Sequence, residues 1–221
     1  MKLWSFLGGP GSVTYGVFDR VRQRLNRKLV AYLRAVSLDG ARSRVLEAGS
    51  GPGFASFLFS LDERVALSVA LDIDHEALQM LGQRKARVAA VGGDLYRLPF
   101  GGGSFDLVWN SSTLEHLDRP GDALAEMTRV TRPGGFVFVG VPYRRGPLGV
   151  QRLMAGTRLG IWIGPVFGEA DVAELVARAG LEPVGMRHYF LRFFIGILAR
   201  RPVAVESRMS DARTADGREA A

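Results

Sequence analysis

The chain has 221 residues and a formal net charge of +7, and this length is enough to bury a sizeable core. It has no cysteine, which excludes disulfides, thiolate metal sites and cysteine nucleophiles. Its three histidines show no zinc-ligand spacing, and no apolar run is long enough to span a bilayer, so we expect neither a metal site nor a membrane span. We therefore expect a cytoplasmic protein, with peripheral membrane association left open.

The positive charge is concentrated at the start of the chain. Residues 1–44 hold nine basic and two acidic side chains, whereas the two kinds cancel over residues 45–221. Apolar spacing predicts a helix over 17–36 with basic residues on its opposite face, and we expect residues 1–40 to form a basic amphipathic lid. This distribution disfavours a nucleic-acid partner. A solvated helix face and contact with an anionic membrane through residues 17–36 remain the alternatives.

Strand-like and helix-like segments alternate through the rest of the chain. Strands are predicted at 44–48, 65–71, 88–91, 105–109, 136–141, 182–189 and 193–198. Helices are predicted at 55–61, 75–85, 120–131 and 169–179, and residues 202–221 have the composition of a disordered tail. This alternation predicts an α/β fold with a mostly parallel sheet.

A glycine-rich turn follows the first predicted body strand. Gly49, Gly51 and Gly53 lie between a strand and a helix, where α/β proteins hold nucleotides, because glycine allows close backbone approach and the helix start presents N–H groups. A dinucleotide fingerprint needs its third glycine at the position that Phe54 occupies. The spacing therefore disfavours NAD.

Five motifs in register resemble the class I S-adenosylmethionine-dependent methyltransferases, especially the small-molecule, type 11-like branch. The motifs are Val45–Gly53, Leu71–Asp74, Gly93–Phe100, Ser104–Val108 with Leu114–His116, and Arg132–Gly135. The resemblance covers residues 44–142 and, more loosely, 165–200. It implies a cofactor-binding domain over 41–201 with a substrate-side insert at 143–168. It also implies a Rossmann-like, doubly wound sheet of about seven strands, mostly parallel with an antiparallel last strand.

The resemblance implies S-adenosylmethionine as the cofactor and assigns residues to it. This cofactor has no phosphate, so carboxylates are expected in place of a basic loop. The methionine end of the cofactor is expected to contact Glu47 and the loop residues Gly49, Ser50, Gly51 and Gly53. The ribose is expected to contact Asp72 and Ile73, and the adenine is expected to contact Asp94 and the Leu95 N–H. Asn110 is expected to line the same pocket. Helix capping is the alternative for Asp72, but Asp74 is better placed as the cap.

His116 is the candidate catalytic residue. Methyl transfer is an in-line displacement in which positioning matters most, and a base is needed only when the acceptor must lose a proton. In the resembling family, a histidine at this position acts as a base in some members and as a pocket wall in others. Both roles stay open here.

The acceptor side of the site is rich in apolar residues. Residues 3–33 and 143–167 contain many aromatic and aliphatic side chains, which indicates a small, hydrophobic or ring-bearing acceptor such as a quinone, phenol, polyketide or lipid-like molecule. Packing of these side chains on the sheet is the alternative. Two other functions stay open, namely methylation of RNA or another macromolecule and a non-catalytic, cofactor-binding module at a membrane surface. The oligomeric state is left undetermined.

Overall fold

The computed structural model describes residues 13–38, 42–82, 87–149, 156–157, 160 and 163–203. Within them, seven strands form one sheet in the order β3-β2-β1-β4-β5-β7-β6. The strands are β1 (Ser43–Ala48), β2 (Val65–Asp72), β3 (Ala89–Gly92), β4 (Phe105–Ser111), β5 (Thr131–Pro142), β6 (Glu182–Tyr189) and β7 (Phe194–Arg200). The first five pair in parallel, and β7 is antiparallel to both β5 and β6. The predicted sheet, with its antiparallel last strand, is confirmed.

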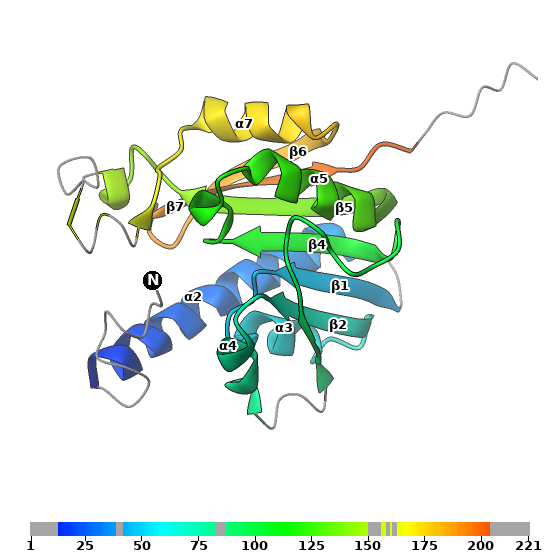
Figure 1. The fold of residues 1–221 in the computed structure, drawn as a ribbon, viewed down its shortest axis with the longest axis horizontal. Helices are drawn as coiled ribbons and strands as arrows, with labels where there is room; N and C mark the ends of the chain where they lie inside the picture. Colours follow the sequence, from blue (N-terminus) through cyan, green and yellow to red (C-terminus); the bar gives the residue numbers. More distant parts are fainter. Residues whose placement is uncertain are drawn as a thin grey trace, which may run out of the picture.

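Helices cover both faces of the sheet (Figure 1). One face carries α2 (Val13–Ser37), α3 (Phe54–Phe59) and α4 (His75–Gln79), and the other carries α5 (Pro120–Val130) and α7 (Glu169–Arg178). Neighbouring strand residues point to opposite faces. Leu107 therefore packs with α2 and α3, whereas Val108 packs with α5 and α7. Burial on both faces explains the nearly continuous apolar runs of β2, β5 and β7.

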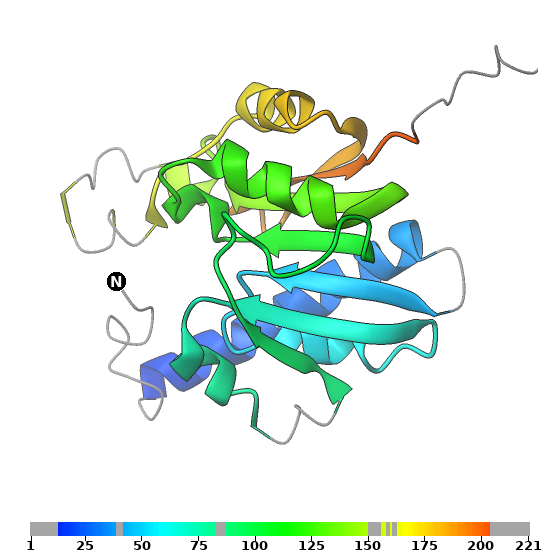
Figure 2. The same cartoon turned by 45° about the vertical axis from the view of Figure 1, so that its right-hand side comes forward.

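The carboxyl ends of β1, β2, β3 and β4 meet at one edge of the sheet, as Figures 1 and 2 show. The start of α2 extends past this edge, and the described parts of the 143–168 insert lie on the same side. The strand order reverses between β1 and β4. Doubly wound sheets bind their ligands at such a switch point, outside the carboxyl ends of the strands.

Several element boundaries differ from the predictions. α2 begins at Val13 rather than at residue 17. The helix predicted over 75–85 ends at Gln79, because the Leu81 N–H bonds three residues back, to the Leu78 carbonyl, and Gly82 has a φ of +55°. Residues 41 and 83–86 lie outside the described residues, as do 1–12 and 39–40 of the predicted lid and 204–221 of the predicted tail.

The turn predicted at Arg132–Gly135 lies inside a longer strand. β5 starts at Thr131, five residues before the predicted strand, and its pairing with β4 passes from Phe105↔Thr131 directly to Leu107↔Phe136. The extra residues bulge out, with Gly134 at a φ of +74°. The glycine-rich signal was correct for the local bend, but the strand continues on both sides of it.

Candidate cofactor and acceptor site

The loop after β1 is held against the ends of β2 and β4. The Gly49 and Ser50 N–H groups both donate to the penultimate carbonyl of β2, at 2.8 and 2.9 Å, and the Gly51 N–H donates to Asp72 Oδ2 at 2.7 Å. Gly49 has a φ of +81°, and a Cβ there would lie 2.6 Å from Thr113 Oγ1. At Gly51 a Cβ would meet no atom within 4 Å, so this part of the loop faces open space.

Gly53 and Glu47 fix the start of α3 under the loop. Gly53 has a φ of +65°, and a Cβ there would lie 2.7 Å from Leu81 Cδ1. The buried Glu47 carboxylate accepts hydrogen bonds from the Ser56 N–H at 2.8 Å and the Ser56 hydroxyl at 2.5 Å. A negative charge is favourable at a helix start. Glu47 therefore holds the helix that supports the loop.

Asp72 ends β2, and Asp74 caps α4. Asp72 accepts the Gly51 N–H on Oδ2 and the Asp74 N–H on Oδ1, the latter at 2.8 Å. Each of its oxygens has a further lone pair for a hydroxyl donor. Asp74 accepts two N–H groups of the first turn of α4, at 3.0 and 3.3 Å, which confirms the capping assignment. Ile73 lies between them with an exposed side chain.

Asp94 and Leu95 follow β3 at the same edge. The Gly93 N–H donates to the Asp72 carbonyl at 3.1 Å, which joins this turn to the end of β2. Asp94 Oδ1 accepts the Tyr96 N–H at 2.9 Å, and the Leu95 side chain is buried. The Leu95 N–H donates no hydrogen bond to any group in the described part of the chain.

Asn110, near the end of β4, is fully buried. Its Nδ2 donates to the Ala48 carbonyl, and its Oδ1 accepts the Leu114 N–H at 3.4 Å. Thr113 Oγ1 donates to the Gly49 carbonyl at 3.3 Å. These contacts hold the short 3₁₀ helix η2 (Leu114–His116) directly against the glycine loop.

His116 and Glu115 lie together at the end of η2. The His116 side chain is 43% exposed, and burial of its ring lowers its pKa from 6.5. The Glu115 side chain is 0% exposed, and its Oε1 lies 4.0 Å from His116 Nε2. Burial raises the Glu115 pKa to about 8, although hydrogen bonding by the Ser112 side chain and by its own backbone opposes the rise. Sequence reasoning missed Glu115, because only its position beside His116 signals it.

Only part of the insert that is expected to line the acceptor side lies within the described residues. Tyr143 is buried in the core, and its hydroxyl donates to Glu169 Oε1 at 2.5 Å. Leu148 and Phe167 are half-buried, and Gly164 packs against His116 and Glu115. Residues 3–12, 150–155, 158–159 and 161–162 lie outside the described residues.

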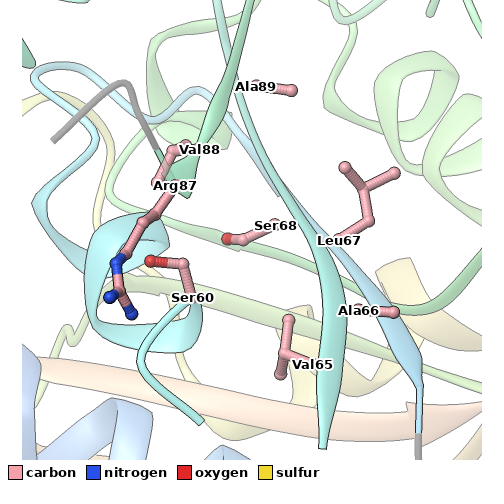
Figure 3. Close-up of a pocket in the computed structure, with 8 residues that line it drawn as sticks. All are labelled: Ser60, Val65, Ala66, Leu67, Ser68, Arg87, Val88 and Ala89. Atoms are coloured by element: carbon pink, nitrogen blue, oxygen red, sulfur yellow. The ribbon is translucent and has the colours of Figure 1, made fainter. Parts of the chain in front are cut away.

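A hollow of about 440 Å³ lies away from this edge (Figure 3). Its lining comes from the end of α3, the start of β2 and the start of β3, namely Ser60, Val65, Ala66, Leu67, Ser68, Arg87, Val88 and Ala89. The amino ends of parallel strands lie opposite their carboxyl ends. The hollow is therefore separate from the glycine loop.

The carboxyl edge suits a nucleoside-type ligand without phosphate. Its loop, residues 49–53, contains no basic side chain, and carboxylates follow β2 and β3, where they accept hydrogen bonds from hydroxyl and amino donors. Within the described ranges, no group of three or more His, Asp or Glu side chains has the arrangement of a metal site. No described helix is long and apolar enough to cross a membrane. Fold and site together define an α/β protein that binds a nucleoside-type cofactor.

Comparison with known proteins identifies the family. Residues 46–139 match the family model described as a methyltransferase domain. A "probable S-adenosylmethionine-dependent methyltransferase" of Mycolicibacterium smegmatis is 35% identical over 173 residues, or 73% of this chain and 66% of that protein. A malonyl-[acyl-carrier protein] O-methyltransferase of Methylovorus sp. is 28% identical over 193 residues, which are 80% of this chain and 62% of that protein. This chain also superposes on the structure of magnesium protoporphyrin IX methyltransferase from Synechocystis PCC 6803 with bound SAH, with a TM-score of 0.69 and 20% sequence identity. The match covers 90% of this chain and 92% of that chain.

This chain belongs to the class I S-adenosylmethionine-dependent methyltransferases, and S-adenosylmethionine is its cofactor. The chain spans between about one third and two thirds of the length of the curated relatives that head the comparison.

Proposed function

We propose that this chain transfers the methyl group of S-adenosylmethionine to a small, hydrophobic or ring-bearing acceptor. The observation that carries the proposal is the hydrogen bond from the Gly51 N–H to Asp72, which joins the open glycine loop to a carboxylate at the switch point of the sheet. The loop 49–53 would hold the methionine end, Asp72 the ribose hydroxyls, and Asp94 with the Leu95 N–H the adenine.

The protein's part in the reaction is to position the reactants and to receive a proton where one is released. The bound cofactor supplies an activated methyl group on a positively charged sulfur. His116 is half-exposed beside the glycine loop, and its lowered pKa keeps the imidazole neutral at pH 7. Its ring can therefore accept a proton from a hydroxyl or amine acceptor. With an acceptor that keeps its protons, the ring forms a wall of the pocket.

An apolar acceptor is supported by apolar side chains next to His116 and in the insert. Leu117 directly follows His116 and is half-buried, as are Leu148 and Phe167 of the insert. Glu115 is uncharged at neutral pH because its pKa is about 8. Such side chains accommodate a ring or an alkyl chain better than a charged metabolite.

Calorimetry with S-adenosylmethionine tests the cofactor site. We expect the Asp72→Asn variant to bind at least about tenfold more weakly, because the amide nitrogen cannot accept the ribose hydroxyl protons. The matched control is Asp74→Ala, which removes the α4 cap and costs about 1 kcal/mol of folding stability while leaving cofactor affinity within about twofold. Failure of the unaltered protein to bind the cofactor would rule the proposal out.

A peripheral contact with anionic membrane is a second proposal, and the exposed cations of α2 favour it. Arg20, Arg24, Arg27 and Lys28 are all exposed along its outer side. Anionic lipid attracts such groups with about 1 kcal/mol each, and an apolar acceptor would be concentrated at that surface.

Vesicle co-sedimentation separates this proposal from a merely solvated helix. We expect binding to phosphatidylglycerol vesicles but not to phosphatidylcholine vesicles, and at least about tenfold weaker binding for Arg20→Glu/Arg24→Glu. The control Arg119→Glu/Arg178→Glu changes the net charge equally on the opposite face of the sheet. Equal losses in both variants would mean that only net charge matters. Tight RNA binding with a steep salt dependence would instead favour a macromolecular substrate.

A further inference from the structure

Glu115 is a buried carboxyl group that the proposed reaction does not use. Its side chain has no exposed surface, and neither Oε1 nor Oε2 has a hydrogen-bond partner of normal geometry in the described part of the chain. Weaker hydrogen bonding by its own backbone and by the Ser112 side chain offsets only part of the effect of burial. An uncompensated buried carboxylate is costly, so a group in this position either stays protonated or has a charged partner that is absent from the free protein.

The groups that face Glu115 provide no such charge. His116 on its own element is 4.0 Å away and neutral at pH 7, since burial lowers its pKa. Tyr189, at the end of β6, is buried, and its hydroxyl is paired with Ser111 Oγ at 2.8 Å. Burial raises the Tyr189 pKa, and the nearby Glu115 raises it further. Among the described residues of the insert, Gly164 packs against Glu115, and a Cβ added to Gly164 would lie 3.4 Å from Glu115 Cγ. No described lysine or arginine forms an ion pair with Glu115.

Glu115 lies on the short helix η2, close to the residue that contacts the cofactor loop. Thr113, two residues earlier, donates to the Gly49 carbonyl at 3.3 Å, and the absence of a Cβ at Gly49 is what lets Thr113 lie there. Glu115 therefore belongs to the same short helix that contacts the loop, and in its buried surroundings its interaction with a positive charge on the cofactor would be only weakly screened.

We infer that the Glu115 carboxylate is the negative counter-charge for the sulfonium of S-adenosylmethionine, and that Glu115 loses its proton when the cofactor binds. Its carboxyl group is a neutral acid in the free protein, ionises when the cation binds, and releases its proton to solvent. With S-adenosylhomocysteine, whose sulfur is uncharged, the carboxyl group keeps its proton. This inference rests on the proposed cofactor site, and it gives the protein a means of distinguishing the methyl donor from the spent product.

The same linkage balances the protons of the reaction. Binding releases one proton from Glu115, and methylation of an X–H acceptor releases one more as the X–C bond forms and the S–C bond breaks. The sulfur then becomes neutral, which removes the reason for Glu115 to stay ionised. The proton of the acceptor, received first by His116, thus has an available final site on Glu115.

Calorimetry at pH 7 in phosphate and in Tris, whose ionisation enthalpies differ, measures the protons released. Starting from a pKa of about 8, we expect release of nearly one proton with S-adenosylmethionine and little with S-adenosylhomocysteine. The amino group of either compound can also exchange protons on binding, and this contribution is measured with the Glu115→Gln variant. Affinity for S-adenosylmethionine should rise by up to about tenfold per pH unit below pH 8, whereas affinity for S-adenosylhomocysteine should change little.

Variants identify the source of the proton. Glu115→Gln should abolish the release and flatten the pH dependence, and Glu115→Leu provides a second uncharged variant should the first fold poorly. The exposed Glu63→Gln and the neighbouring His116→Gln should both keep the release. Absence of release in the unaltered protein, or its persistence in Glu115→Gln, would overturn the inference. No binding of either compound would instead overturn the proposed function, and the inference would fall with it.

Discussion

Glycine serves different physical purposes at positions 49 and 51 of the cofactor loop. Both residues have positive φ, but a Cβ at Gly49 would collide with Thr113, whereas a Cβ at Gly51 would meet nothing within 4 Å. The sequence showed that the loop needs glycine. It did not show the collision, because Thr113 lies 64 residues further along the chain and reaches Gly49 only through the pairing of β1 with β4.

The paired variants Gly49→Ala and Gly51→Ala separate these purposes. Alanine in a left-handed conformation costs about 1–2 kcal/mol at either position. Gly49→Ala adds an overpacking cost of about 1–3 kcal/mol, so it should be clearly the less stable of the two in urea unfolding. Similar stabilities would show that Thr113 moves aside at no cost.

At the scale of elements, α2 is attached to the body by an ionic cluster as well as by apolar packing. Arg34 Nε of α2 lies 3.3 Å from Asp62 Oδ2, and the Arg64 guanidinium donates two hydrogen bonds to the same carboxylate, at 3.0 and 2.9 Å. Arg64 also donates to the Leu38 carbonyl at 3.1 Å, just after α2. These hydrogen bonds, chiefly those from Arg64, lower the Asp62 pKa to about 2.

The cluster predicts a specific acid sensitivity. Because the Asp62 pKa is lower in the folded protein than in the unfolded chain, its stabilisation is complete above about pH 4 and is lost as the pH falls towards about 2. Asp62→Asn should therefore lose stability near neutrality and show a flatter decline between pH 4 and 2. Thermal unfolding across this range measures the effect, with the exposed Asp118→Asn as control. A decline as steep as that of the unaltered protein would contradict the assignment.

At the scale of the molecule, hydrogen bonds join Arg201, which directly follows β7, to the middle of the chain. The Arg201 N–H donates to the Gly135 carbonyl, and the Gly134 N–H donates to the Arg201 carbonyl, both at 2.8 Å. The Arg201 guanidinium donates to the carbonyls of Thr128, Arg129 and Thr131. One side chain thus satisfies the end of α5 and the start of β5.

Arg201→Ala should destabilise the whole fold, because it leaves these carbonyls without their charged donor. Hydrogen bonds to charged groups contribute about 1.5–3 kcal/mol, and we expect a loss of that size in urea unfolding. Arg178→Ala, which removes only an exposed pair with Glu174, should change stability by less than about 1 kcal/mol. An equally small effect of Arg201→Ala would show that solvent replaces the guanidinium.

Features that depend on local pattern could be predicted from the amino-acid order. Apolar periodicity gave the alternation of strands and helices, glycine spacing gave the loop after β1, and the order of polar residues gave the Asp74 cap. The cofactor class followed from five motifs in register, whereas one residue expected on the acceptor side, Tyr143, lies in the core.

Contacts between groups that are far apart along the chain depend on how the elements pack, and so does the burial of groups such as the Glu115 carboxyl. Nothing in Leu114–Glu115–His116 indicates that Glu115 is fully buried, because its burial comes from packing beside the sheet and under Gly164. The continuation of β5 through Arg132–Gly135 likewise depends on pairing with β4. Local pattern fixes the conformation of a segment, but burial and the pKa values that follow from it depend on neighbours far along the chain.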